Sequence, residues 1–219
     1  MNPSSRPDDS HGGGTGAAGS SGPSGAAALY ERVRKCTLCE PHLPLGARPI
    51  LQLDPRARVL IAGQAPGRRT HASGVPFDDA SGDRLRQWLG LDRDAFYDPA
   101  RVAILPMGLC YPGRAGGGDA PPRPECAAQW RRPLLDTLPG IRLTLVIGAH
   151  AQHWHLPDDR RTLTERVAQW QEAWPVRVCL PHPSPRNQHW CRRNPWFEAT
   201  LLPALRARVA QVMSATPDG

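Results

Sequence analysis

The sequence predicts an α/β domain built on a central, mostly parallel sheet of four strands. Two observations lead to this fold class. Short apolar runs alternate with amphipathic stretches from about residue 57 onward, as in sheets whose strands are buried on both faces. The chain has 219 residues, enough for one well-buried domain but not for two large ones. The apolar runs, and therefore the expected strands, are residues 58–62, 102–107, 143–147 and 176–180.

The elements around these strands follow from local signals. Residues 1–26 are mostly Gly, Ser, Pro and Ala, which predicts a disordered tail ahead of a domain over residues 27–215. A short helix over residues 27–35 leads into the first cysteine pair. Ser81 is the expected N-cap of the next helix, and Pro203 should kink or delay the last one. The helices between and after the strands are expected over residues 82–91, 126–138, 163–174 and 194–213.

Charge and composition narrow the class of protein. The formal net charge is +7 and the sequence pI is about 9.6, which is typical of a protein that binds a polyanion. Lys35 is the only lysine, so nearly all basic residues are arginines, as a GC-rich coding sequence would give whatever the protein does. A solvated basic surface therefore remains an alternative. We find no apolar run of about 18 residues and no N-terminal signal pattern. We therefore expect a protein of the reducing bacterial cytoplasm or nucleoid, without a membrane partner.

Four of the six cysteines form two pairs. Cys36 and Cys39 are spaced C-x2-C, and Cys110 and Cys126 are spaced C-x15-C. A C-x-x-C step places two thiolates on one turn of backbone, and the fold must bring the second pair to it. Four-thiolate sites hold either zinc or an iron–sulfur cluster. The alternative is that the cysteines are scattered in the core, and for the remaining two, Cys179 and Cys191, we expect this.

The first expected strand is followed by a polar segment, residues 63–77, that reads GQAPGRRTHASGVPF. In a parallel sheet, ligands bind at the carboxyl ends of the strands. Glycine and proline there let the backbone approach a ligand and offer amide donors. Phe77 ends the segment, where a flat ring suits stacking on a planar heterocycle or local packing.

The fourth expected strand is followed by HPSPRN, residues 182–187. His182 can donate a hydrogen bond to a developing anion, although a structural histidine in a tight turn is the alternative. The two prolines stiffen the turn and hold Arg186 forward, which suits a wedge that enters a duplex.

Taken together, GQAPG, GVPF, the two cysteine pairs and HPSPRN resemble the uracil-DNA glycosylase superfamily. The resemblance covers the chain from about Cys36 to its end. The cysteine spacing and the GxAPG and GxPF motifs are similar to the iron–sulfur branch, family 4 and its relatives. The stretch FDDASGD, residues 77–83, is closer to family 5, and HPSPRN is closer to the single-strand-selective branch.

The resemblance implies a three-layer α/β/α fold and a monofunctional, monomeric DNA glycosylase. Such an enzyme flips a damaged base out of DNA and cleaves its N-glycosidic bond. Phe77 would then stack on the base, His182 would stabilise the departing anion, and Arg186 would belong to the wedge. The implied site residues are Gln64 and His182 for catalysis, Ala65, Pro66, Gly67, His71, Phe77 and Asp79 for the substrate, Ser184, Pro185, Arg186 and Asn187 for DNA, and Cys36, Cys39, Cys110 and Cys126 for a [4Fe-4S] cluster.

The sequence departs from the family pattern at two places. Gln64 stands where family 4 usually has Glu, and an amide can orient water but cannot take its proton. Residues 105–109 offer no uracil-reading Asn before Cys110. The nearby polar substitutes are Asp78, Asp79, Asp83 and His71, although Asp83 could instead support a helix N-terminus. Uracil, hypoxanthine, xanthine and oxidised pyrimidines all stay open as substrates. A catalytically weak or inactive iron–sulfur protein that binds nucleic acid, and a zinc-stabilised domain with another ligand, are the alternatives.

Overall fold

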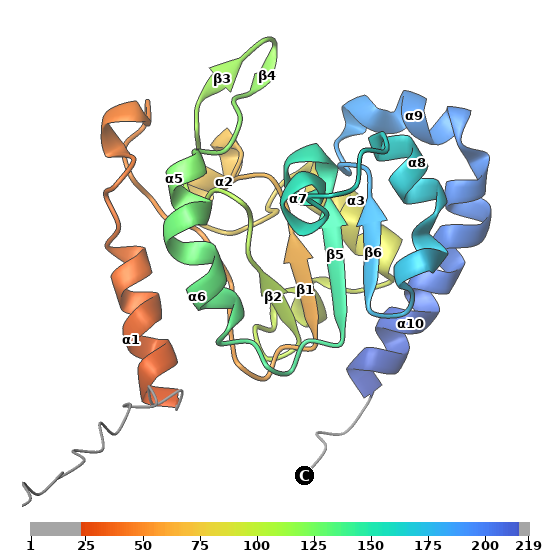
Figure 1. Cartoon of the computed structure of the whole chain (residues 1–219), viewed down its shortest axis with the longest axis horizontal. Coiled ribbons are helices and arrows are strands. Elements are labelled where there is room, and N and C mark those ends of the chain that lie inside the picture. The colour runs from red at the N-terminus through yellow and green to blue at the C-terminus, as the bar shows by residue number, and fades with distance from the viewer. Residues whose placement is uncertain (1–22, 215–219) are drawn as a thin grey trace, which may run out of the picture.

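The computed structural model describes residues 23–214, and Figure 1 shows the sheet at their centre. All four strands are parallel and lie in the order β2-β1-β5-β6, with Ile61 opposite Ile104 and Val146 opposite Cys179. The α/β class with a four-stranded parallel sheet is therefore confirmed. The strands are β1 (Val59–Ala62), β2 (Val102–Ile104), β5 (Leu143–Ile147) and β6 (Arg177–Leu180).

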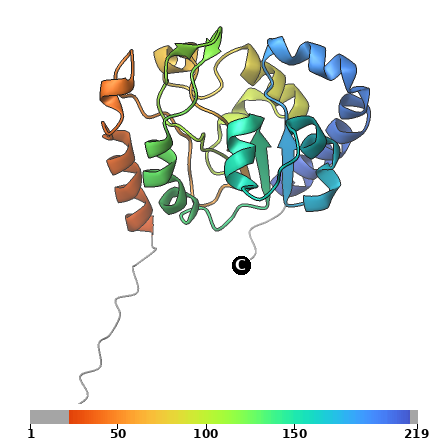
Figure 2. The same cartoon turned by 45° about the horizontal axis from the view of Figure 1, so that its top comes forward.

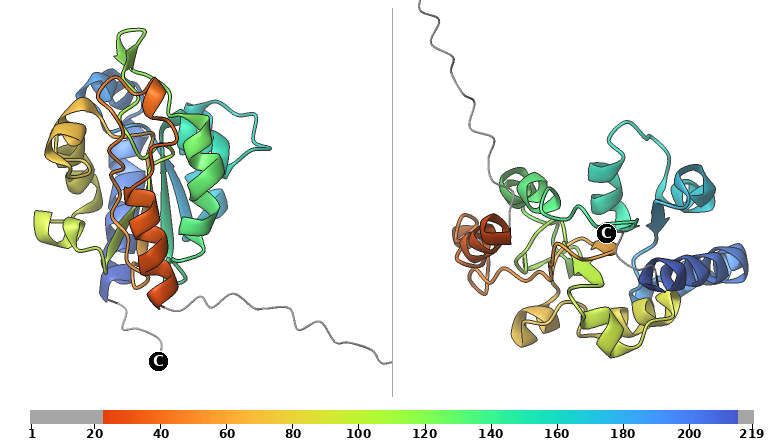
Figure 3. Two further views of the ribbon diagram at one scale, coloured as in Figure 1. Left: turned by 90° about the vertical axis from the view of Figure 1, so that its left-hand side faces the viewer. Right: turned by 90° about the horizontal axis from the view of Figure 1, so that it is seen from below.

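Helices cover both faces of the sheet, which confirms the three-layer arrangement (Figure 3). Val59 and Ile61 of β1 pack on the side of α3 (Ala80–Leu89) and α10 (Leu202–Ser214). Leu60, between them, belongs to a second buried cluster with Leu134 of α6 (Arg132–Leu135). Alternate side chains of a strand point to opposite faces, so the continuous apolar run supplies both layers.

The first helix begins earlier than expected. It is α1 (Pro23–Arg34), so residues 23–26, which we assigned to the tail, are helical. Residues 1–22 of the expected tail, and residue 215 at the expected end of the domain, lie outside the described residues. Tyr30 and Thr137 share a hydrogen bond of 2.8 Å, which ties α1 to the segment after α6 beyond the β2 edge of the sheet.

Two of the expected helices change their hydrogen-bonding pattern in the middle. The helix expected over 126–138 is α5 (Pro124–Cys126), the π-helical turn η2 (Ala127–Arg131) and α6. The last helix is a π-helical turn, η5 (Phe197–Leu201), followed by α10. Each π turn ends two residues before a proline, Pro133 or Pro203. Proline has no backbone N–H to donate, so a widened turn accommodates it without ending the helix.

The helix expected over 163–174 is divided. It consists of α8 (Leu163–Ala168) and a 3₁₀ turn, η3 (Trp170–Ala173).

The expected N-cap of α3 is wrong. Asp79, not Ser81, is the N-cap, and its carboxylate accepts the N–H groups of Ser81 and Gly82 at 2.9 and 3.0 Å. A carboxylate accepts two such donors better than one hydroxyl can.

Several elements were not expected from the sequence. They are short, and their apolar residues do not recur over enough turns to give a pattern. They comprise η1 (Glu40–His42), α2 (Arg68–Ser73), α4 (Arg93–Tyr97), a hairpin of β3 (Arg114–Ala115) and β4 (Gly118–Asp119), α7 (Gly148–His155), η4 (Pro185–Asn187) and α9 (Gln188–Arg193). None of the helices within 23–214 is both long and apolar enough to cross a membrane.

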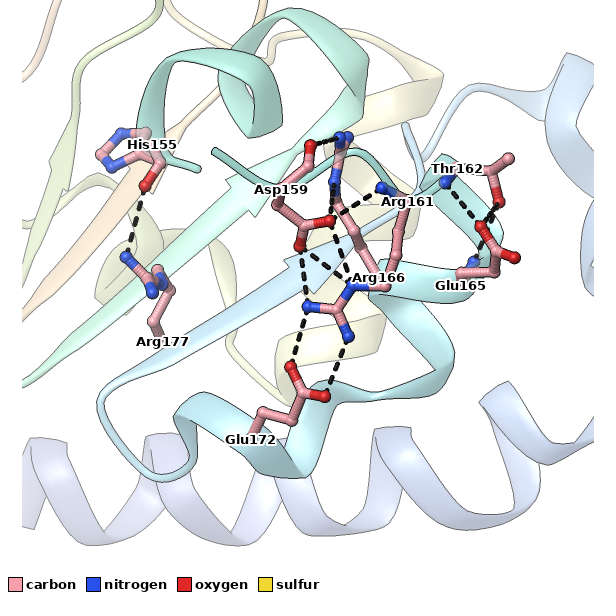
Figure 4. A network of polar contacts seen from close by, with 8 residues as sticks. All are labelled: His155, Asp159, Arg161, Thr162, Glu165, Arg166, Glu172 and Arg177. Atoms are coloured by element: carbon pink, nitrogen blue, oxygen red, sulfur yellow. Dashed lines mark hydrogen bonds and ion pairs between the residues drawn. The ribbon is translucent and has the colours of Figure 1, made fainter. Parts of the chain in front are cut away.

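The connection from α7 to α8 is fixed by a network of charges (Figure 4). Arg161 donates hydrogen bonds to Asp159 and to Glu172 of η3, at distances of 2.7 to 3.1 Å. Arg161 thereby holds the pKa of Asp159 well below its usual range. Thr162 and Glu165 form a capping box that begins α8. These charges are paired with one another, so we assign them a structural role.

Candidate active site

A cavity of about 400 Å³ opens at the carboxyl edge of the sheet. Four segments far apart in the sequence form it: the loop after β1, the loop after β2, the β3–β4 hairpin and the loop after β6. The hairpin stands on the side to which the strand arrows point (Figures 1 and 2). This is where a parallel sheet collects its ligand-binding residues.

Most of the expected site residues line this cavity. Those that do are Gln64, Ala65, Pro66, Gly67, Phe77, Asp79, His182, Ser184 and Arg186. Three others do not, namely His71, Pro185 and Asn187. His71 lies in α2, where its ring packs 6.1 Å from that of Tyr111, and Tyr111 is the residue that lines the cavity. The amide of Asn187 donates to the backbone carbonyl of His182 at 2.8 Å. His71 and Asn187 therefore contact residues of the cavity wall, Tyr111 and His182, without lining the cavity themselves.

Phe77 has an unusual backbone conformation. Its φ is 55°, and it is the one non-glycine residue with positive φ in the described part of the chain. That conformation is strained for a bulky side chain, and strain of this kind gathers at functional sites. The ring meets Phe96 edge-on, with centroids 6.3 Å apart and planes at 88°. The structure therefore holds Phe77 in place at the cavity wall, as a stacking platform requires.

Gly82 makes the conformation of Phe77 possible. A Cβ added at Gly82 would lie 1.7 Å from the carbonyl oxygen of Phe77, so the two backbones are in close contact. We expect Gly82→Ala to destabilise the protein by roughly 1–3 kcal/mol, the usual cost of overpacking, and to displace Phe77. Urea unfolding would measure the loss. Alanine normally stabilises a helix relative to glycine, so unchanged or increased stability would contradict this reading. Gln87→Ala, on the exposed side of α3, is the control and should leave stability unchanged.

His182 is oriented by its own loop. The backbone N–H of Ser184 donates to Nδ1 of His182 at 3.2 Å, so a neutral ring carries its proton on Nε2. Burial lowers the pKa of His182, and the negative charges of Asp79 and Asp119 oppose that shift. The ring lines the cavity with Nε2–H as its remaining donor.

A buried arginine holds the segment after β2 through hydrogen bonds to its backbone. Arg131, in η2, is 2% exposed and donates to the carbonyl oxygens of Leu105 and Pro106 at 3.1 and 3.2 Å. Burial lowers its pKa to about 10, and the ring of Trp154 lies 4.7 Å from the guanidinium. The pKa of His155 falls to about 3 through burial, so its neutral Nε2 accepts from Arg131. This cluster fixes Pro106 in the cavity wall.

The hairpin and its neighbours bring residues to the site that the sequence motifs did not indicate. Arg114, Gly118 and Asp119 line the cavity, as do Arg68 and Tyr111. The Gly-rich stretch between the two later cysteines was the available signal, because consecutive glycines favour a tight turn. Gly116 and Gly117 do form the tip, with φ values of 56° and 82°.

A model of the family described as the Uracil DNA glycosylase superfamily matches residues 51–206, which include the loops after β1, β2 and β6 and the β3–β4 hairpin. The chain belongs to the uracil DNA glycosylase superfamily. Among solved structures, it is similar to the solution NMR structure of a Methanosarcina acetivorans protein designated a candidate uracil DNA glycosylase. That match has 15% identity and a TM-score of 0.45, and it covers 74% of this chain and 97% of the other. A similarity this distant says nothing about function, and the family assignment rests on the family model.

The four paired cysteines of this superfamily member lie together. Cys36, Cys39, Cys110 and Cys126 all line a second, smaller cavity near α1 and α5. Cys179 and Cys191 belong instead to the main core cluster, as expected. Among the described residues, no group of three or more His, Cys, Asp or Glu side chains is placed so that it could hold a metal ion.

Two of the four sulfurs accept a hydrogen bond from an N–H group. Trp130 Nε1 donates to Cys36 at 3.2 Å, and the backbone N–H of Leu109 donates to Cys126 at 3.3 Å. The Arg123 side chain and the backbone of Arg48 lower the pKa of Cys39 and Cys110 respectively, and so oppose the larger effect of burial. Such donors stabilise thiolates that carry a metal or cluster. Burial raises the pKa of Cys110 to about 11 and that of Cys126 to about 12, so both are protonated thiols near neutral pH unless a metal displaces the proton.

Proposed function

We propose that this protein is a DNA glycosylase that hydrolyses the N-glycosidic bond of a flipped-out, deaminated or damaged base during base-excision repair. One observation carries the proposal: Phe77, His182 and Arg186 meet in one cavity of about 400 Å³ at the carboxyl edge of the sheet. Their roles need a single site, because a flipped base must be stacked, charge-stabilised and kept out of the duplex at the same time. The membership of the uracil DNA glycosylase superfamily supports the reaction class.

The chemistry follows from the positions of these side chains. The base would stack on Phe77 while the bond between its nitrogen and C1′ of the sugar breaks. The bonding electrons go to the base, and the Nε2–H of His182 would donate to the oxygen or nitrogen on which negative charge develops. Water then adds to C1′, which gives an abasic site and the free base.

The identity of the base is open to a direct experiment. The family pattern uses one Asn amide to recognise uracil, and residues 105–109 contain no Asn. The polar side chains that line the cavity here include Asp79, Asp119, Arg68, Arg114 and the Tyr111 hydroxyl, which offer a different set of donors and acceptors. Oligonucleotides carrying uracil, hypoxanthine, xanthine or oxidised pyrimidines, single- and double-stranded, would be incubated with the protein and cleaved at abasic sites. Release of one of these bases supports the glycosylase. Tight binding to damaged DNA without release of any base would favour a binding protein that has lost catalysis.

We also propose that Cys36, Cys39, Cys110 and Cys126 hold a [4Fe-4S] cluster, with zinc as the alternative. The support is their common cavity and the hydrogen bonds that the sulfurs of Cys36 and Cys126 accept. A [4Fe-4S] cluster binds one thiolate on each of its four irons, so its four ligands are spaced around the cluster. A single metal ion would instead require all four sulfurs to converge on one atom. Its role would be structural, because the four residues connect the segment after α1 to the loop after β2.

Arg186 is the residue that we expect to separate duplex from single-stranded substrates. Arg186→Ala should weaken duplex processing more than single-strand processing, since only a duplex resists extrusion of the base. Steady-state cleavage of the same lesion in both contexts would measure this. Both activities of the wild type should fall steeply with salt, because arginine–phosphate contacts release counterions.

The matched control is Arg101→Ala. Arg101 is exposed, forms an ion pair with Asp98 at 3.3 Å, and precedes β2 at the opposite edge of the sheet, so the variant removes the same charge away from the cavity. It should leave the ratio of duplex to single-strand cleavage unchanged. Equal losses on both substrates in Arg186→Ala would contradict the wedge role.

A further inference from the structure

The hairpin places a carboxylate in the cavity that the sequence motifs did not indicate. Asp119, at the end of β4, lines the cavity, and a Cβ added at Gly67 would lie 3.5 Å from its Oδ2. Its charge reaches His182, where it opposes the effect of burial on the pKa of the ring. Within residues 23–214, no hydrogen bond or ion pair occupies the Asp119 carboxylate, so its lone pairs are available to a ligand or to water.

Side chains of two other loops donate hydrogen bonds to the backbone on either side of Asp119. Gln64 Nε2 donates to the carbonyl oxygen of Ala120 at 3.1 Å, and Arg186 Nη1 donates to that of Gly117 at 3.1 Å. These two contacts lie on either side of Asp119 in the sequence. A catalytic side chain on a loop needs such support, because an error of about 1 Å in its position is costly. Gln64 and Arg186, which bind the hairpin backbone, thus line the same cavity as Asp119.

The other acidic and amide groups of the cavity are less suited to take a proton. Asp79 lines the cavity, but its Oδ1 accepts the N–H groups of Ser81 and Gly82 as the cap of α3. Gln64 has no basic oxygen, and its NH₂ group is already bound to Ala120. Asp119 is therefore the carboxylate of this cavity with no structural bond to break.

We propose that Asp119 is the general base that activates water in this active site, an inference that rests on the glycosylase function proposed above. The C1′–N bond breaks, and its electron pair leaves with the base, which His182 stabilises. A water molecule bound to Asp119 then loses a proton to the carboxylate while its oxygen forms the bond to C1′. The proton on Asp119 then passes to solvent or to the released base, which restores the carboxylate. One water is consumed, and no other reactant is needed.

The test uses the full-length protein as purified, and the DNA lesion that the wild type releases fastest. In single-turnover assays, Asp119→Asn should slow base release by roughly 100- to 10,000-fold, the usual contribution of a general base. Affinity for the same DNA and the melting temperature should stay at the wild-type values or rise. Asp158→Asn is the matched control, because Asp158 is exposed, lies outside this cavity and loses the same charge. It should cleave at the wild-type rate.

A second variant distinguishes catalysis from support. Asp119→Ala should be as slow as Asp119→Asn, and added formate should restore part of its rate, because a small carboxylate can enter the vacated space and accept the proton. Formate should leave the wild type unchanged. An Asp119→Asn rate within threefold of the wild type would overturn the proposal. So would a slow Asp119→Ala variant with a lowered melting temperature and no response to formate, because Asp119 would then be structural. If the wild type itself releases no base, the glycosylase function fails, and the role of Asp119 fails with it.

Discussion

Replacing His182 with alanine is expected to slow base release by roughly 100- to 1,000-fold, the typical loss when one preorganised donor to a developing anion is removed. The reason lies in the loop after β6. Ser184 occupies Nδ1 of His182, and burial keeps the ring neutral by lowering its pKa, so Nε2–H is the donor that the ring offers to the cavity. Single-turnover cleavage of a lesion that the wild type processes would measure the loss.

Two further variants make this result specific. His182→Gln keeps an amide donor of different reach, so it should lose less activity than His182→Ala. His153→Ala removes an imidazole from the exposed face of α7, away from the cavity, and should cleave at the wild-type rate. The melting temperature and metal content of His182→Ala should match those of the wild type, because the ring is not part of the core. Wild-type cleavage by His182→Ala would show that the role given to His182 is wrong.

The strands could be predicted from the sequence because their burial leaves a simple pattern. The expected strand 143–147 coincides with β5. Leu60 and Ile61 of β1 face opposite layers, so that strand is apolar throughout. The same property predicts where the loops after β1 and β6 meet. This is why Phe77 and His182, so far apart in the chain, could be placed in one site before the structure was known.

The parts that could not be predicted depend on short-range geometry. The β3–β4 hairpin has two residues in each strand and is largely exposed, so no alternation of apolar and polar residues marks it, and Asp119 was missed with it. His71 was expected at the substrate. The structure places it in the six-residue helix α2, and a helical turn directs it toward Tyr111 instead. A motif read as a loop cannot show which side chains face inward.

Replacing Cys110 with serine is expected to remove most of the iron and to lower stability together. A serine hydroxyl is a poor substitute for a thiolate. The four cysteines connect α1, the loop after β2 and α5, so the free energy of binding the proposed cluster would also be free energy of folding. The wild type should be brown, with broad absorbance near about 400 nm, as iron–sulfur thiolates are. A chain of this size loses roughly 2–4 °C in Tm per kcal/mol, so a loss of a few kcal/mol is readily seen.

Cys191→Ser tests whether these effects belong to the cluster or to any buried cysteine. Cys191 is 7% exposed, as buried as Cys39 or Cys126, but it packs in the main core, away from the cavity that the other four share. A hydroxyl there should cost some stability, because it is buried in apolar surroundings, while the iron content stays at the wild-type value. Iron and colour lost equally from both variants would show that general unfolding releases the metal. Zinc without iron in the wild type would replace the cluster by a four-thiolate zinc site, and full iron in Cys110→Ser would remove Cys110 from the ligand set.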